Sequence, residues 1–410
     1  MPASDRVCLG LLLLAGAPLA AVELDSVQIH GFISQGYLIT TQTDWFGPTD
    51  QGTFEFTEAA INVSAKPRDD LRIGIQLVAR DFADSGDNQI EIDWAFADWR
   101  ATERSGLKVG RIKMPYGLYN ESRDLDFDHA TVFLPQVVYL PQLRDYTLAI
   151  NGVMLYGGVD LGGSGQLDAS VFGGGQNTRA EGDLGDYLSD LGAGTEISSV
   201  HVGSIAGTAL TWQTPLDGLR LRLSGVGFWD FTAEGRTEAE KVPGQPGVYA
   251  DIDIATGIDQ FYSGVASIEY QRSGLTLAAE YLYEYAKTIS DLVAHPYTYQ
   301  PLPPGSVRLE LPAATSQVVR YTLTEAMYAA ASYRIADLYE LSISRQLRFG
   351  NRDNPAASFD RSWCLAARYD IFSNWLVKGE YQYHEGSELD TGSDNPESWS
   401  VFAVKTTVDF

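Results

Sequence analysis

Apolar and polar residues alternate with a period of two in one long segment after another, and this pattern most constrains the fold. The segment 71–80 reads LRIGIQLVAR, and the segment 363–371 reads WCLAARYDI. In a β-strand such alternation produces one apolar and one polar face. Helical periods are scarce, so the pattern predicts an all-β protein.

The alternation divides the chain into about sixteen strands, an even number of the kind found in bacterial transmembrane barrels. We expect them at 27–41, 54–66, 71–82, 89–101, 107–114, 147–160, 165–175, 203–214, 218–232, 259–272, 275–287, 318–334, 338–349, 359–371, 374–386 and 397–410.

Short turns alternate with long loops between these strands. The short turns are 67–70, 102–106, 161–165, 215–217, 273–274, 336–337 and 372–373; the long loops include 115–146, 176–201, 232–258 and 288–317. Outer-membrane barrels have short periplasmic turns and long external loops. With both termini periplasmic, seven turns and eight loops join sixteen strands.

A secreted β-sandwich or solenoid also alternates, but two features favour a transmembrane antiparallel β-barrel. Strands of roughly 10 to 14 residues match a tilted bilayer crossing and exceed the usual globular strand. Aromatic residues such as Trp375, Tyr381 and Tyr383 gather near strand ends, as in interfacial girdles.

The first 21 residues have the order of a secretory signal peptide. Arg6 precedes the apolar run Val7 to Ala21, which ends in small residues. We therefore expect residues 1–21 to be a signal and residues 22–410 to form the barrel domain. Removal of Cys8 leaves Cys364 alone, which excludes an intrachain disulfide. No later stretch of about 18 apolar residues predicts a transmembrane helix.

Composition excludes one class of partner. The chain has 54 acidic and 29 basic residues, a net charge of −25, whereas nucleic-acid binding needs a basic footprint. Aromatic residues make up 11% of the chain, which argues against disorder.

The last strand ends in an alternating series that closes on an aromatic residue, Phe410. The series Phe402, Val404, Thr406, Val408 and Phe410 resembles the signature read by the barrel assembly machinery. We expect this machinery to be a partner during biogenesis and Phe410 to be part of the assembly signal.

The segment 109–147 reads VGRIKMPYGLYNESRDLDFDHATVFLPQVVYLPQLRDYT and resembles the trimeric Gram-negative porins. In that family a strand ending in a Gly-Arg pair, like Gly110-Arg111, leads into a long third loop that folds into the pore. The resemblance implies a constriction loop at 115–146 and a homotrimer among the lipids and lipopolysaccharide of the Gram-negative outer membrane. It also implies a water-filled channel for passive diffusion of small hydrophilic solutes and ions.

The resemblance and the alternation together nominate the charged residues of the pore. The loop residues are Glu121, Arg123, Asp124, Asp126, Asp128 and Arg144, whose acids would face basic residues on the opposite wall. The wall residues are Glu58, Arg72, Arg80, Glu91, Asp93, Arg111, Lys113, Arg220, Arg222, Arg320, Arg368 and Lys378, and alternation adds Glu280, Glu284, Glu380 and Lys405. Lipid-facing placement would cost about 2 to 4 kcal/mol for Arg or Lys at the midplane. Many of these charges could instead only solvate the wall or the rims.

Two further expectations follow from the family comparison. Family members tend to place arginines on the walls of strands two and four, whereas this chain has Glu58, Glu91 and Asp93 there. That difference favours a cation-tolerant or mixed pore. Ile90, Ile92, Trp94 and Phe96 share one face of the alternation and would contact a neighbouring subunit or lipid.

Two rival functions stay open. A substrate-specific channel for phosphate, sugars or dicarboxylates would share this architecture. An outer-membrane barrel enzyme would need an activated nucleophile, and the five histidines are scattered along the sequence. No two histidines lie within about five residues and Cys364 is alone, so we expect no metal site and no cofactor.

Overall fold

The chain folds into one closed antiparallel β-barrel in a computed structural model that describes residues 27–45, 47–83, 86, 88–176, 195–242, 244–302, 305–355, 358–390 and 396–410. The strands are β1 (Val27–Thr41), β2 (Phe56–Arg68), β3 (Leu71–Phe82), β4 (Ile90–Arg100), β5 (Ser105–Lys113), β6 (Ala149–Asp160), β7 (Gln166–Gly175), β8 (Thr195–Gln213), β9 (Leu219–Lys241), β10 (Val248–Arg272), β11 (Leu275–Leu302), β12 (Gly305–Glu310), β13 (Ala314–Ile335), β14 (Tyr339–Phe349), β15 (Phe359–Phe372), β16 (Trp375–Glu385) and β17 (Ser398–Asp409). The expected signal segment lies outside the described residues.

The ring contains sixteen strands, as the alternation predicts. Each strand pairs with its sequence neighbour, and β1 pairs with both β2 and β17, which closes the sheet. β12 pairs only with the far end of β11, while β13 pairs with the rest of β11. β12 and β13 therefore act as one interrupted strand. Closure removes the unpaired edges of an open sheet.

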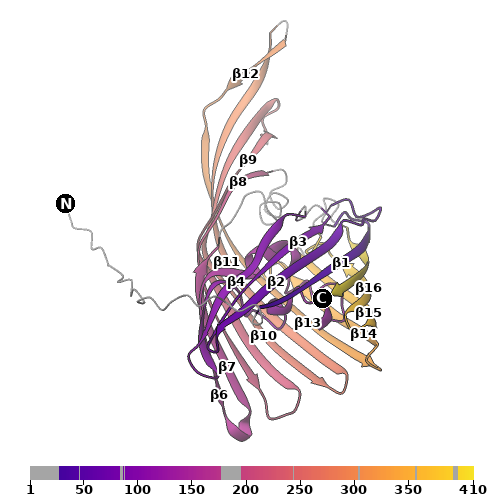
Figure 1. The fold of residues 1–410 in the computed structure, drawn as a ribbon. Helices are drawn as coiled ribbons and strands as arrows, with labels where there is room; N and C mark the ends of the chain where they lie inside the picture. Colours follow the sequence, from indigo (N-terminus) through magenta and orange to yellow (C-terminus); the bar gives the residue numbers. More distant parts are fainter. Residues whose placement is uncertain are drawn as a thin grey trace, which may run out of the picture.

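Three connections differ from the sequence expectation because strands extend into them. β9 continues to Lys241 and β10 begins at Val248, in place of the loop expected at 232–258. β11 has 28 residues and β12 and β13 follow it, in place of the loop expected at 288–317. β8 begins at Thr195, within the loop expected at 176–201. Figure 1 shows these strands rising together beyond one rim of the barrel.

Burial on the strands is inverted relative to a soluble protein. On β15, Asp360 and Ser362 are 0% exposed, whereas Trp363 and Leu365 are 48% and 52% exposed. The polar face therefore points into the barrel and the apolar face points outward. A sheet of this kind is stable only where its outer face meets an apolar medium.

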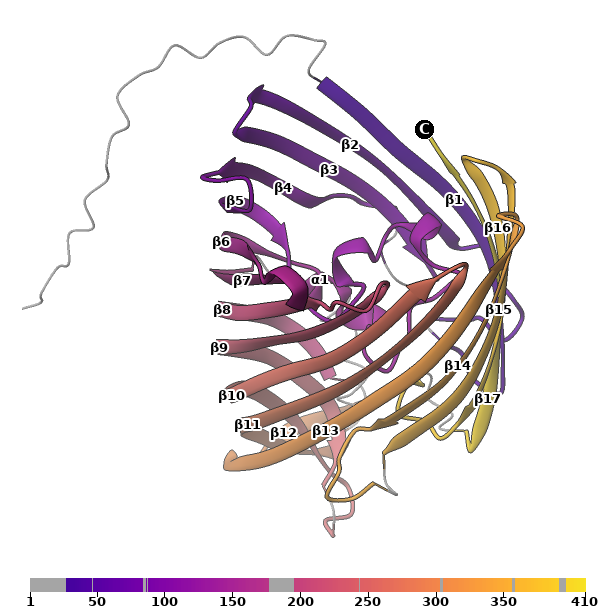
Figure 2. The same ribbon diagram turned by 90° about the horizontal axis from the view of Figure 1, so that it is seen from below.

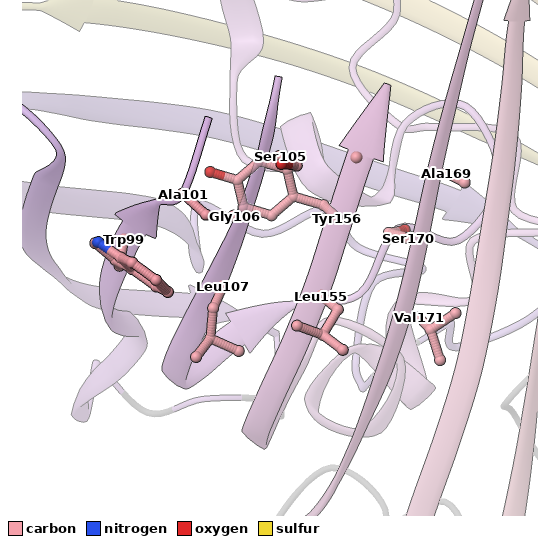
Figure 3. A pocket seen from close by; sticks show the side chains of 11 residues that line it. Trp99, Ala101, Ser105, Gly106, Leu107, Leu155, Tyr156, Ala169, Ser170 and Val171 are labelled. Atoms are coloured by element: carbon pink, nitrogen blue, oxygen red, sulfur yellow. The ribbon is translucent and has the colours of Figure 1, made fainter. Parts of the chain in front are cut away.

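The outer face carries rows of apolar side chains that run across neighbouring strands. Figure 3 shows Leu107, Leu155 and Val171 from β5, β6 and β7 beside Trp99 of β4. They border a shallow outer groove of about 430 Å³ whose floor contains small residues. None of the helices in the described residues is long and apolar enough to span a membrane.

A β-bulge in β4 changes the face on which two aromatic residues lie. Leu77 pairs with Ile92 but Gln76 pairs with Trp94, so Asp93 is the extra residue. Ile90 and Ile92 stay on the outer face, as expected, while Trp94 and Phe96 lie on the inner face opposite Gln76 and Gly74. The expectation that Trp94 and Phe96 contact a neighbouring subunit or lipid is therefore wrong, because a bulge shifts the alternation by one residue.

The end of the chain belongs to the closing seam of the ring. Phe410 and Gly31 exchange two backbone hydrogen bonds of 2.9 Å. The Phe410 ring lies over Gly31, where an added Cβ would come within 2.6 Å of the ring. This position accounts for the last aromatic residue structurally, and its role as an assembly signal stays a prediction.

Candidate pore constriction

The segment between β5 and β6, residues 114–148 and here named the β5–β6 loop, lies within the ring of strands (Figure 2). It contains four short helical turns: η2 (Asn120–Ser122), η3 (Asp126–Asp128), η4 (Pro141–Leu143) and α1 (Arg144–Thr147). Its contacts reach β2 to β4 on one side and β9 to β11 and β13 to β17 on the other. The individual bonds decide what the loop residues do.

Asp126 attaches the loop to β16 and β17. Its carboxylate is 3.2 Å from Lys378 Nζ and 2.8 Å from Lys405 Nζ, and it accepts a 2.6 Å hydrogen bond from Thr407. Lys405 also pairs with Glu58 at 2.5 Å. Burial alone would raise the pKa of Asp126, but the two ammonium groups hold it well below its usual range. Buried charges of this kind need such compensation.

Backbone groups of the loop bind three further wall residues. Glu380 Oε2 accepts hydrogen bonds from the backbone N–H groups of Val132 at 2.6 Å and Phe133 at 3.2 Å. Arg368 donates to the Phe127 carbonyl at 2.6 Å. Arg348 donates to the Val137 carbonyl at 3.0 Å. These side chains replace the hydrogen-bond partners that an irregular backbone lacks.

Glu280 on β11 gathers a second set of bonds. Its carboxylate accepts from the Leu118 N–H at 2.8 Å and from the hydroxyls of Tyr139, Tyr328 and Ser267 at 2.6, 2.9 and 2.6 Å. Burial, followed by the Glu280 charge, raises the pKa of Tyr139 well above its usual value. Tyr139 therefore remains a neutral donor.

Asp93 in the β4 bulge fixes the other end of the loop. Its carboxylate is 2.9 Å from Arg144 and from Gln76, and 3.4 Å from Lys113. Lys113 also binds Asp124, and it holds the pKa of Asp124 below the usual range against the opposing effect of burial. The bulge thus places the carboxylate of Asp93 close to both Arg144 and Lys113.

The remaining predicted residues divide into loop, wall and rim contacts. Arg123 donates to the Leu140 carbonyl at 2.8 Å, within the loop, and Arg111 donates to the Asp93 carbonyl at 3.1 Å. Arg222 pairs with Glu121 at 2.9 Å. Asp128 is exposed.

Five wall residues complete the set. Arg220 pairs with Glu269 at 2.7 Å. Arg72 and Arg80 lie on the inner face by register, opposite Asp98 and Glu58. Glu91 and Arg320 are exposed and lie opposite Val78 and Thr288, both inner-face positions.

The predicted acidic residues of the loop therefore do not all face basic wall residues across a water-filled pore. Asp124 and Asp126 are bonded directly to lysines, whereas Glu121 and Asp128 are exposed. Two cavities of about 90 Å³ each flank the loop, one bordered by β2 and β3 and the other by β10, β11 and β13 to β15.

Two groups of residues escaped the sequence predictions. Arg348 follows Ser344 and Gln346 on the polar face of β14, so the alternation contains a signal for it. His384 binds Asp360 at 2.9 Å and stacks on Trp399 with ring centroids 4.0 Å apart. Twenty-four residues separate the pair in sequence, and only the β15–β16 register brings them together. No cluster of three possible metal ligands occurs among the described residues.

No protein-family profile matches this sequence, and no curated protein sequence matches it. Solved structures do resemble the fold. The OmpF structure from Salmonella typhi shares 16% identity, with 94% of this chain and 97% of that chain covered and a TM-score of 0.55.

Two others are comparably similar. The anion-selective porin from Comamonas acidovorans shares 13% identity over 94% of this chain and 99% of that chain, with a TM-score of 0.54. The trimer form of OmpT from Vibrio cholerae shares 14% identity over the same fractions, with a TM-score of 0.50. Together with the closed ring of sixteen strands, these similarities show that the chain has the fold of the sixteen-stranded outer-membrane porins.

Proposed function

We propose that the protein is an outer-membrane porin through which small hydrophilic solutes and ions diffuse passively. The observation that carries this proposal is the inverted barrel, with Lys378 and Asp360 at 0% exposure inside and Leu365 at 52% outside. A barrel of this size encloses more space than wall side chains fill. The β5–β6 loop would set the width of the remaining path as its constriction.

The loop is suited to this role because it is held from several directions. Asp126, Glu380 and Glu280 tie it to β16, β17 and β11, and Asp93 ties it to β4. A loop fixed by buried charged groups keeps a defined pore cross-section, whereas a loop attached only at its ends would not. The four attachments therefore support a permanent constriction.

Selectivity would follow from the charges that remain partly exposed. Arg72, Arg222 and Arg220 contribute positive charge, and Glu121 and Glu91 contribute negative charge. Rings of side chains of either sign govern pore selectivity at short range. We infer a mixed pore with weak ion preference, and a channel specific for phosphate, sugars or dicarboxylates is the second candidate.

The outer membrane of a Gram-negative cell, with periplasmic termini and contacts to lipid and lipopolysaccharide, fits the apolar outer face. A homotrimer is the proposed assembly, supported by the trimer form of the Vibrio cholerae structure. After the bulge correction, Ile90 and Ile92 remain as outward apolar residues of β4, at 74% and 47% exposure.

The enzyme alternative has one new candidate, the His384–Asp360 pair. Its geometry does not favour nucleophile activation, because His384 Nε2 already contacts Gln382 Oε1 at 2.8 Å. Asp360, Ser362 and His384 are at most 1% exposed. A catalytic base must reach the proton that it removes, so this pair supports a structural role.

The test is recording of the refolded protein in planar bilayers with a salt gradient. We expect ohmic steps in groups of three and a small reversal potential. Correctly folded protein without any conductance would contradict the open channel, and a saturable current with one solute class would favour the specific channel.

A further inference from the structure

The inner wall carries an aromatic and cationic cluster on β4, β5 and β6. Trp94 and Phe96 of β4 lie with ring centroids 5.2 Å apart at 33°. Lys108 Nζ of β5 lies 5.4 Å from the Phe96 ring centroid and 5.5 Å from that of Tyr156 on β6. All four side chains are partly exposed and occupy inner-face positions.

Glycines opposite the rings make this arrangement possible. A Cβ at Gly74 would come within 2.9 Å of the Trp94 ring, and one at Gly106 would come within 2.5 Å of the Tyr156 hydroxyl. Both rings therefore lie across bare backbone, close to the wall. The β4 bulge supplies the other condition, since it turns Trp94 and Phe96 inward.

The hydrogen bonds of the cluster leave its cation available. Tyr156 donates to Asp98 at 2.6 Å, which fixes the ring and occupies that carboxylate oxygen. Within the described part of the chain, the recorded contacts of the Lys108 ammonium are its two aromatic rings. The cation–π contacts attract the Lys108 ammonium but provide no hydrogen-bond acceptor for its three N–H donors. An anionic group in the lumen would provide such acceptors.

We propose that Trp94, Phe96, Lys108 and Tyr156 form a binding subsite for small aromatic carboxylates within the pore. The solute ring would pack on Trp94 and Phe96, and its carboxylate would accept hydrogen bonds from Lys108. This proposal rests on the proposed channel function and adds a solute class to it. A neutral sugar fits less well, because the acceptor opposite Lys108 in the sheet, Asp98, already binds Tyr156.

The experiment uses benzoate as the probe and acetate as the matched anion without a ring. Refolded protein in planar bilayers is first checked for conductance in potassium chloride, which tests the channel itself. Benzoate is then added to one side, and we expect a saturable reduction of single-channel current that acetate does not produce.

Two variants and two controls locate the effect. Lys108→Gln and Trp94→Leu should each weaken the apparent affinity for benzoate by about tenfold, the size of one lost charge-assisted or stacking contact. Trp99→Leu changes an outward tryptophan of the same strand, and Arg361→Gln removes an exposed charge of β15 that is not part of the predicted pore wall. Both should leave benzoate block unchanged.

The outcomes separate the two proposals. Absence of conductance in potassium chloride overturns the channel function itself. Normal conductance with equal effects of benzoate and acetate overturns the subsite. Block by maltose that depends on Trp94 but not on Lys108 also overturns it, because the site would then bind sugars.

Discussion

Two parts of the inner wall differ in what covers them. The covered wall, on β14 to β17, consists of Arg348, Asp360, Arg368, Lys378, Glu380 and Lys405, all at most 7% exposed. The open wall, on β3 to β9, consists of Arg72, Lys108, Tyr156 and Arg222, all partly exposed. Both walls are polar faces of similar strands, yet the covered wall binds loop residues 126–137 through buried side chains, whereas Arg222 of the open wall binds the exposed Glu121.

The difference teaches that an inward charge in a barrel has two possible uses. On the covered wall, Lys378 and Glu380 satisfy groups of the loop and have no contact with bulk water. On the open wall, Arg222 and Lys108 retain exposed atoms that can interact with a passing ion. Alternation predicts that a residue points inward, but not which of these uses it has.

The largest expected effect is on the covered wall, from Asp126→Leu. This change leaves Lys378 buried with only the Thr131 carbonyl at 3.0 Å as its recorded partner. Breaking a buried ion pair costs about 3–5 kcal/mol, so the free energy of unfolding in guanidinium should fall by about that amount. Conductance should become noisier as the loop loosens.

Asp128→Leu is the matched control for Asp126→Leu, because Asp128 lies in the same helical turn and is exposed. Its effect should stay below about 1 kcal/mol. The double variant Asp126→Leu with Lys378→Met should recover most of the lost stability. Equal losses in the two single variants would remove the distinction between buried and exposed loop acids.

A smaller loss is expected from Glu380→Leu. The backbone N–H groups of Val132 and Phe133 would lose their acceptor, but only the Val132 bond is fully buried, so the loss should be about 1–3 kcal/mol, the cost of one unpaired buried group. Glu380→Gln keeps one carbonyl acceptor and should lose less. Unfolding in guanidinium measures both variants, with Glu385→Gln as an exposed control on the same strand. No loss in Glu380→Leu would show that the loop is held without this carboxylate.

Acid should weaken the attachment of the loop through His129. Burial, with the nearby Lys378 charge, lowers the pKa of His129 to about 4, and its ring contacts the Ser122 carbonyl at 3.1 Å. A histidine with a folded pKa below its unfolded value of about 6.5 favours folding at higher pH. That contribution is present above about pH 6.5 and is lost as pH falls toward 4.

The measurement is Tm at pH 7 and at pH 4.5 for the wild type, His129→Gln and the exposed control His201→Gln. We expect the Tm of the wild type and of His201→Gln to be lower at pH 4.5 than at pH 7. The Tm of His129→Gln should decrease by a smaller amount. Asp126 adds no loss in this interval, because its depressed pKa keeps it ionised there. An identical fall in all three proteins would assign the acid effect to other groups.

The sequence predicts the barrel more completely than it predicts the pore. Contact with lipid imposes alternation on every crossing strand, so the strand number and most short turns follow from the pattern. Beyond the membrane this constraint ends. The segments after Thr232 and Thr288 pair as strands, but they lack the regular apolar and polar alternation of the crossing strands. They were therefore expected to be loops.

The pore depends on contacts that no local pattern contains. One extra residue at Asp93 reverses the facing of Trp94 and Phe96, and a bulge leaves no periodic signal of its own. Asp126 meets Lys378 across 252 residues of sequence. Asp124 and Asp126 bind lysines of the strands, and their burial follows only from the path of the folded loop.

The smallest structural effect, and the sharpest test of the two walls, comes from Arg222→Gln on the open wall. Its partner Glu121 is itself exposed, with a side chain at 45%, so the ion pair contributes under about 1 kcal/mol to stability. Tm should barely change. The freed Glu121 charge should raise cation over anion permeability by less than about fivefold, since a partly solvated charge acts within about a Debye length of 8 Å. Reversal potentials under a potassium chloride gradient measure this change.

Arg368→Gln removes the same charge from the covered wall, where it binds the Phe127 carbonyl, and should instead lower Tm with little shift of reversal potential. If both variants shift the reversal potential equally, solutes reach the covered wall as well, and the loop does not divide the inner surface into two parts.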